Sequence, residues 1–270
     1  MNAGQPELDY ELARAIQLSL EMESAFGVDH LPKGERFEAK GLNPSAAPAP
    51  QVSPQAASTA AAAQIPAPNP VQESVSTAPA PVISQSEPEA LAQLNLEIAA
   101  CESCNLSQTR KQVVPGQGNP KARLMFIGEA PGADEDLSGE AFVGQAGQLL
   151  TKMIGAMGLS RDDVFIANIL KCRPPEDRNP RIEEAQACSH FLERQIELIK
   201  PEVICTLGSQ ALNHLLQRTE PIGKMRGQTL DFYGAKLVPT YHPAYLLREP
   251  SAKRPAWQDL QRVMGLLGLG

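Results

Sequence analysis

Short apolar runs alternate with segments of helical pattern from residue 121 to the end of the chain. Runs typical of buried strands occupy residues 122–130, 163–170 and 202–208, and a hairpin-like stretch at 228–243 ends in a further strand. The segments with helical spacing between and after them are 144–158, 179–201, 209–217 and 254–268. This alternation predicts an α/β sandwich with a mostly parallel central sheet.

A stretch of Ala, Pro, Ser, Gln and Val, residues 41–90, precedes this region. It has almost no charge and no apolar periodicity, so it cannot bury enough surface to offset the entropy of ordering it. We therefore predict an N-terminal acidic segment (1–40), a disordered linker (41–90) and a folded domain (91–270). The first 90 residues hold 11 acidic and 4 basic residues, which leaves 20 of each in the rest. The predicted domain is thus neutral, and the net charge of −7 does not argue against a basic face that binds nucleic acid.

Polar and glycine-rich sequences follow four of the predicted strands. They read GEAPG (128–132), NILKCRP (168–174), LGSQ (207–210) and TYHPAYLL (240–247). In open α/β sheets, ligands bind at the carboxyl ends of the strands. Because these residues exceed what a simple connector needs, we expect the functional site at this edge of the sheet.

Four cysteines suggest a metal centre. Cys101 and Cys104 form a C-x2-C pair, which presents two thiolates on one side of a turn. Cys172 is expected in the loop after a strand and Cys188 on the next helix, so all four thiolates can converge. Spacing alone does not separate zinc from an iron–sulfur cluster. A thioredoxin-like redox pair fits less well, because a helix precedes the pair. Cys205 lies inside an apolar run and is expected in the core.

Six motifs occur in order: CESC, GEAPGADED, FVGQAG, NILKCRPP, LGSQA and YHPAYLL. They resemble the family 4 uracil-DNA glycosylases, the iron–sulfur branch of that superfamily, over about residues 93–265. The resemblance implies a three-layer α/β/α sandwich and a [4Fe–4S] cluster held by Cys101, Cys104, Cys172 and Cys188. It also implies base excision repair, in which deoxyuridine is flipped out of DNA and its N-glycosidic bond is hydrolysed, leaving an abasic site.

The residue types at the strand ends fit this reaction. Phe142, in the stretch EAFVGQAG, is expected to stack on the flipped base. The amide of Asn168 offers a donor and an acceptor to the Watson–Crick edge of uracil. His242 is expected to donate to uracil O2, in a hydrogen bond that strengthens as the base leaves as an anion. The structural alternatives are a core Phe, an amide bonded to the backbone and a turn-capping His.

Glu129 is expected to position or deprotonate the attacking water, or to hold its loop. Better-known uracil glycosylases carry Asp at the position of Ala130, so the acid–base role shifts to Glu129 or is absent. The backbone N–H groups of residues 128–132 are expected to bind uracil O2 or a phosphate, since glycines allow close approach. The other residues expected at this pocket are Gly128, Gly132, Gln145 and Gly147.

The segment HPAYLLREP (242–250) resembles the DNA-inserting loop of the family. We expect it to fill the gap left by the flipped base and to touch phosphate through Leu246, Leu247 and Arg248. Ser209, at a predicted helix start, suits a phosphate contact, although an ordinary helix N-cap explains it equally well. Further candidates for contacts with the DNA backbone are basic: Arg173, Arg178, Arg181, Lys224 and Arg226.

Two other functions fit part of the sequence. A zinc-binding nucleic-acid module without enzymatic activity explains the cysteines, but not Glu129, Asn168 and His242 at strand ends. A related iron–sulfur glycosylase with a different base preference, or one that forms a covalent adduct, is the second alternative. Some such relatives carry a basic loop with a His before the HP motif, whereas the comparable stretch here, PIGKMRGQTL (221–230), has none. We therefore predict the hydrolytic uracil glycosylase.

Residues 9–24 have the pattern of an amphipathic helix, which is marginal in water without a surface to cover it. This segment resembles a ubiquitin-interacting helix, and residues 17–20 resemble a bacterial sliding-clamp-binding peptide. Both patterns are short, so we expect a protein partner without naming it. The start of the chain lacks a signal-peptide pattern, and no stretch has the ~20 apolar residues of a membrane span. We expect a cytoplasmic bacterial monomer that acts on uracil-containing DNA in the nucleoid and has no membrane partner.

Overall fold

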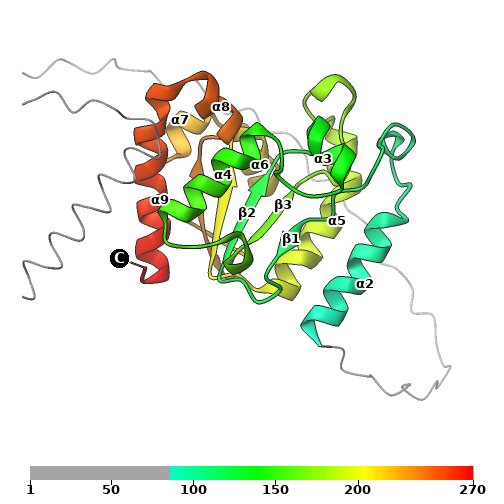
Figure 1. The fold of residues 1–270 in the computed structure, drawn as a ribbon, viewed down its shortest axis with the longest axis horizontal. Helices are drawn as coiled ribbons and strands as arrows, with labels where there is room; N and C mark the ends of the chain where they lie inside the picture. The colour runs from blue at the N-terminus through cyan, green and yellow to red at the C-terminus, as the bar shows by residue number, and fades with distance from the viewer. Residues whose placement is uncertain (1–85, 270) are drawn as a thin grey trace, which may run out of the picture. The chain divides into compact units, whose positions relative to one another are not determined.

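The computed structural model describes residues 86–269, and the predicted N-terminal helix and most of the predicted linker lie outside them. Their centre is a six-stranded sheet with the order β1-β3-β2-β4-β6-β5 (Figure 1). The four central strands are parallel: β3 (Phe165–Asn168), β2 (Leu124–Gly128), β4 (Val203–Leu207) and β6 (Ala235–Thr240). Two antiparallel strands form the edges: β1 (Gln117–Gly118) and β5 (Leu230–Phe232).

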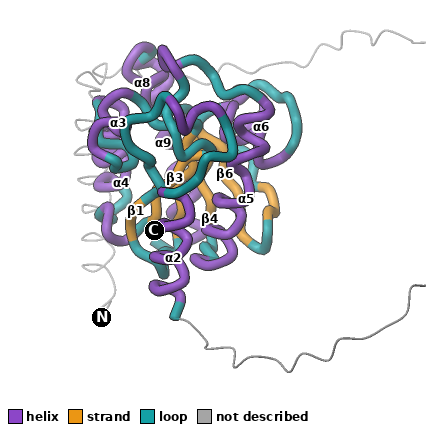
Figure 2. Tube along the Cα trace, turned by 90° about the vertical axis from the view of Figure 1, so that its right-hand side faces the viewer, coloured by secondary structure: helices purple, strands orange, loops and turns teal. Residues whose placement is uncertain are grey.

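Helices cover both faces of this sheet, as Figures 1 and 2 show. One face carries α2 (Glu87–Ala99), α5 (Ile182–Ile199) and α6 (Ser209–Leu216). The other carries α4 (Gln145–Ala156) and α9 (Lys253–Leu267). The shorter helices are α3 (Ala133–Ser138), α7 (Ile222–Met225) and α8 (Pro243–Arg248). Single 3-10 turns lie at Asn105–Gln108, Arg161–Asp163, Pro175–Asp177 and Pro250–Ala252.

Alternate residues of the central strands face the two helical layers. On β2, Met125 and Ile127 pack with α2 and α5, whereas Leu124 and Phe126 pack with α4 and α9. Because both faces are covered, every residue of β2, β3 and β4 is buried, and the strands read as continuous apolar runs. The predicted three-layer sandwich with a mostly parallel sheet is confirmed. Cys205 is fully buried in the core, as expected.

The short elements were not predicted. β1 has only two residues, too few for any alternation to show. The segment predicted to be a DNA-inserting loop is instead helical over α8, with Pro243 at its first position, where a missing N–H costs nothing. α2 begins at Glu87, a few residues before the predicted start of the folded domain. Between residues 86 and 269, no helix is long and apolar enough to cross a membrane.

Candidate active site

A cavity of about 410 Å³ opens at the carboxyl ends of the central strands. Glu129 follows β2, Asn168 ends β3, and His242 follows β6, so the parallel strands deliver all three side chains to one edge. The structure brings together these predicted residues, which line the cavity: Glu129, Gly132, Phe142, Asn168, His242 and Arg248. The predicted position of the site is therefore also where the fold leaves room for a ligand.

Asn168 lies at the floor of this cavity with 2% of its surface exposed. Its Oδ1 atom is buried and has no hydrogen-bond partner. Gly128 faces it across the β2–β3 pair. A Cβ atom on Gly128 would lie 2.4 Å from Asn168 Oδ1 and 2.5 Å from Phe142 Cζ. Gly128 therefore acts by leaving space for both side chains, although it does not itself line the cavity.

Phe142 lies in the loop before α4 and adopts a left-handed backbone conformation with φ of 55°. Two groups hold this turn. Arg161 donates hydrogen bonds to the carbonyls of Ala141 (2.6 Å) and Phe142 (3.1 Å). Gly147 packs so closely that a Cβ atom there would lie 1.9 Å from the Phe142 carbonyl oxygen. Gly147 thus shapes the turn rather than lining the cavity, and Ala146, not Gln145, is the α4 residue that lines it.

His242 is the N-cap of α8, and its Nδ1 accepts a hydrogen bond from the backbone N–H of Ala244 at 3.1 Å. Nδ1 is therefore unprotonated, which leaves the proton of the neutral ring on Nε2. Burial, reinforced by the positive charge of Arg248, lowers the pKa of His242 to about 4. The ring lies 5.7 Å from that of Phe142, centre to centre. His242 thus offers a neutral N–H donor at physiological pH.

Three carboxylate residues line the cavity, Glu129, Glu135 and Asp177, and the first two have different roles. Burial raises the pKa of Glu129, as suits a group that exchanges a proton. Glu135, which sequence reasoning missed, accepts three backbone hydrogen bonds, from Gly132 (3.0 Å), Val143 (2.9 Å) and Gly144 (3.0 Å). It thereby joins the loop after β2 to the loop that carries Phe142. The sequence signal for it was an acidic residue in the first turn of a helix.

Two predictions for this region need correction. The backbone N–H of Gly132 was expected to bind uracil O2 or a phosphate, but it donates to Glu135. Leu246 was expected to insert into DNA, but its side chain is fully buried in the core beneath α8. Leu247 and Tyr245 are the exposed apolar residues of α8, at 44% and 39%. Ser209 begins α6 and is half-buried outside the cavity lining, so its phosphate contact stays a prediction.

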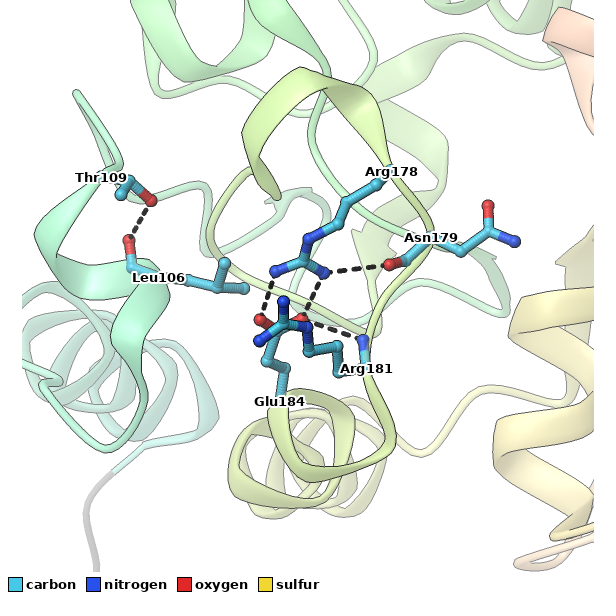
Figure 3. A network of polar contacts seen from close by, with 6 residues as sticks. All are labelled: Leu106, Thr109, Arg178, Asn179, Arg181 and Glu184. Carbon is cyan, nitrogen blue, oxygen red and sulfur yellow. Dashed lines mark hydrogen bonds and ion pairs between the residues drawn. The ribbon is translucent and has the colours of Figure 1, made fainter.

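Three of the basic residues expected on DNA already have acidic partners. Arg178 donates to both carboxylate oxygens of Glu184, at 2.8 and 2.5 Å, and to the Asn179 carbonyl (Figure 3). Glu184 also accepts from the backbone N–H of Arg181, so it ties down the start of α5 (Figure 3). Ion pairs likewise engage Arg173 with Asp177 and Arg226 with the buried Asp259. Arg178 and Arg248 both line the cavity, but the guanidinium of Arg178 is paired with Glu184, whereas Arg248 is exposed.

The four predicted metal ligands line a second, much smaller cavity of about 10 Å³. Cys101 follows α2, Cys104 precedes a 3-10 turn, Cys172 lies in the loop after β3, and Cys188 is on α5. No disulfide joins any of the cysteines between residues 86 and 269. Arg110 donates to the sulfur of Cys172 at 3.1 Å. The predicted convergence of the four cysteines is therefore what the fold produces.

The four cysteines are suitable ligands for a positively charged metal centre, because such centres bind thiolates. Burial raises the pKa of Cys172 and raises that of Cys188 to about 11, so bare thiolates there are disfavoured without a compensating cation. Within the described part of the chain, no three His, Cys, Asp or Glu side chains are grouped closely enough for a single metal ion. Four cysteines that line one cavity are a donor set suited to an iron–sulfur cluster, in which each iron takes one thiolate.

Comparisons with known proteins agree with this geometry. The family model of the uracil DNA glycosylase superfamily matches residues 115–261. The type-4 uracil-DNA glycosylase of Saccharolobus solfataricus is 48% identical over 176 residues, covering 62% of this chain and 82% of that protein. Those of Thermotoga maritima and Archaeoglobus fulgidus are 43% and 42% identical, covering 63% and 67% of this chain and 91% and 94% of those proteins. This chain therefore belongs to the uracil DNA glycosylase superfamily, and within it to the type-4 uracil-DNA glycosylases.

Proposed function

We propose that this protein is a DNA-repair enzyme that excises uracil by hydrolysing its N-glycosidic bond. The observation that carries the proposal is the partnerless Oδ1 of Asn168 at the floor of the cavity. An unsatisfied buried acceptor costs about 1–3 kcal/mol, so its presence here points to a ligand that donates. Uracil N3–H is such a donor, and the Asn168 side-chain NH2 group reaches uracil O4 in the same pairing.

His242 and Phe142 complete the recognition of the flipped base. The ring of Phe142 provides a stacking face, held by Arg161 and the packing of Gly147. The Nε2–H of neutral His242 donates to uracil O2. Negative charge grows on that oxygen as the glycosidic bond breaks, so this hydrogen bond is stronger in the transition state than with bound substrate.

Glu129 serves the attacking water. Its carboxylate accepts a hydrogen bond from the water and orients it toward the sugar carbon as the base departs. Its raised pKa makes it a better proton acceptor than an exposed Glu. The proton lost from the water passes to this carboxylate, and the leaving uracil anion is held by Asn168 and His242.

We also propose that Cys101, Cys104, Cys172 and Cys188 hold a [4Fe–4S] cluster. Bound there, the cluster supplies a cross-link between the end of α2, the loop after β3 and α5. Because Asn168 is four residues before Cys172, such a cross-link fixes the strand end that reads the base. Leu247 and Arg248 on α8 are the residues we assign to DNA contact, with Arg248 near phosphate.

A cleavage assay tests the proposal directly. The full-length protein is incubated with an oligonucleotide that carries one uracil, and with a matched oligonucleotide that carries thymine. We expect an abasic product from the first alone, and its near loss with Asn168→Ala and with His242→Ala. Absence of abasic product from the wild-type protein overturns the proposed function.

We further propose that residues 9–24 bind a protein partner through their apolar residues at helical spacing, while the glycosylase domain acts as a cytoplasmic monomer. A pull-down with residues 1–40 that is lost on Ile16→Asp and Leu20→Asp substitution supports a specific partner. Equal recovery with both peptides, or none with either, contradicts it.

A further inference from the structure

Lys171 is a buried cation that the proposed reaction does not use. Only 1% of its surface is exposed, and its backbone lies between the base-reading Asn168 and the cluster ligand Cys172. Its Nζ donates to the carbonyl oxygen of Asn168 at 2.9 Å and to Gln195 Oε1 at 2.7 Å. Burying an ammonium group is costly unless its hydrogen bonds are satisfied, so this placement requires a reason.

Gln195 anchors the lysine from the opposite side. It lies on α5 and is fully buried, and its Nε2 donates to the Pro115 carbonyl at 2.7 Å. The side-chain amide is therefore oriented by its own donor, which leaves Oε1 facing Lys171. The result is a continuous chain of hydrogen bonds from Pro115 through Gln195 and Lys171 to the Asn168 carbonyl.

The peptide group that follows Asn168 is held at both ends. Its carbonyl accepts from Lys171, and its N–H, on Ile169, donates to the Gly128 carbonyl at 3.0 Å. The side-chain Oδ1 of Asn168, in contrast, has no hydrogen bond within the protein. The direction of the Asn168 amide is therefore set by these backbone contacts together with its packing against Gly128.

We infer that Lys171, oriented by Gln195, is a positioning residue that aims the amide of Asn168 at the flipped base. This inference rests on the proposed function, since it concerns how the same pocket reads uracil. Lys171 touches neither the base nor the sugar, and it acts through the Asn168 backbone.

The placement of Lys171 also explains why a cation is used. Its side chain lines the cysteine cavity together with the four cysteines. Four thiolates around a [4Fe–4S] centre carry net negative charge, which offsets the desolvation of the buried ammonium. A neutral donor would gain less from that charge than an ammonium group does. Lys171 therefore lies between the cluster site and the base reader, in contact with both.

A double-mutant cycle tests the inference on the cluster-loaded, full-length protein. The variants are Lys171→Met, Asn168→Ala and the two combined. We expect Lys171→Met to retain its iron and its absorbance near ~400 nm, to lower kcat/KM on uracil DNA about 10–100-fold, and to weaken binding of free uracil about 10-fold. In the Asn168→Ala background, the same substitution should change kcat/KM less than about 3-fold.

Two further variants keep the test decisive. Gln195→Leu removes the acceptor that orients Lys171 and leaves the cysteines untouched, so it decides the matter if Lys171→Met fails to fold or loses iron. Val263→Ala removes a buried methyl pair in α9, far along the chain from either site, and serves as the control for simple destabilisation. It should lower the melting temperature without changing the affinity for free uracil.

The possible outcomes distinguish a failure of the inference about Lys171 from a failure of the proposed function. Additive losses in the cycle, or unchanged uracil affinity in Lys171→Met and Gln195→Leu, overturn the positioning role of Lys171. Wild-type protein that leaves uracil DNA intact overturns the proposed function instead. Normal wild-type activity together with an additive cycle rejects only the inference about Lys171.

Discussion

The two cavities at the carboxyl edge of the sheet differ in kind, although only a few residues separate Asn168 from Cys172. The base cavity is open, about 410 Å³ in volume, and contains an acceptor without a partner. The cysteine cavity is about 10 Å³, and its lining includes the four cysteines, Arg110 and Lys171. The difference agrees with the two proposed roles, an exchangeable base in the first cavity and a permanently bound cluster in the second. The proposed base-reading residue, Asn168, and a proposed cluster ligand, Cys172, thus lie within a few residues of each other at the end of β3.

The largest effect on activity is expected when a side chain that lines the base cavity is removed. His242→Ala should lower kcat/KM on uracil DNA by about 10²–10³-fold, because it deletes a donor to the developing anion. The iron content should stay at the wild-type level, and the melting temperature should fall only slightly, because the substitution removes the helix cap that accepts from the Ala244 N–H. His190→Ala, an exposed histidine on α5, is the matched control and should leave kcat/KM unchanged. Comparable losses in both variants contradict the role of His242.

In the cysteine cavity, a substitution should affect stability and iron content more than the chemical step. Cys172→Ala should lose iron and lower the melting temperature, because the cross-link between α2, the β3 loop and α5 is lost. Activity should fall in proportion to the folded fraction. Cys205→Ala, a buried cysteine of the core, is the control and should retain iron. Full iron content and an unchanged melting temperature in Cys172→Ala would exclude Cys172 as a ligand.

The pH profile distinguishes Glu129 from His242, the two titratable cavity residues with proposed roles in the reaction. With its pKa raised by burial, Glu129 takes up a proton at a higher pH than an exposed Glu. If its carboxylate accepts the proton of water, kcat/KM must fall as the pH is lowered through that raised pKa. His242, with a pKa of about 4, stays neutral until the solution is more acidic. Glu129→Gln should remove the acidic limb and lower the plateau about 10²-fold; a limb that persists in this variant implicates another group.

The smallest effect is expected from arginines that are already paired. Binding to abasic DNA should show a salt dependence whose slope falls by about one in Arg248→Ala, as for a lost phosphate contact. Arg178→Ala should leave that slope unchanged, because its guanidinium is engaged by Glu184. A similar fall in both variants contradicts the assignment of Arg178 to loop support.

The fold and the main site residues were predictable because their signals are local. Buried parallel strands leave continuous apolar runs, and strand ends carry the residues that line the cavity. Asn168 and His242 were identified this way, and their structure agrees with the expected position. The exposure of a residue within a short helix depends on distant contacts, which explains why both Leu246 and Leu247 were assigned to DNA although only Leu247 is exposed.

The roles of other residues were not predicted, because they depend on contacts between residues that are distant in the sequence. Glu135 was one of several acidic residues in GEAPGADED and received no role, but it accepts N–H groups from the loop at 143–144. Lys171 appeared to be one basic residue among several in NILKCRPP, and only the packing of α5 brings Gln195 against it. Arg178 was assigned to DNA because its charge is visible in the sequence and its partner Glu184 is not.

The order of the four cysteines has a consequence for synthesis of the chain. Cys104 leaves the ribosome 84 residues before Cys188. At typical elongation rates this interval is on the order of 10 s. During that time, Cys101 and Cys104 are solvent-accessible thiols of an incomplete site, because α5, which carries Cys188, has not yet been made. Assembly of the proposed cluster therefore requires that this pair stay reduced and unoccupied until α5 has been made.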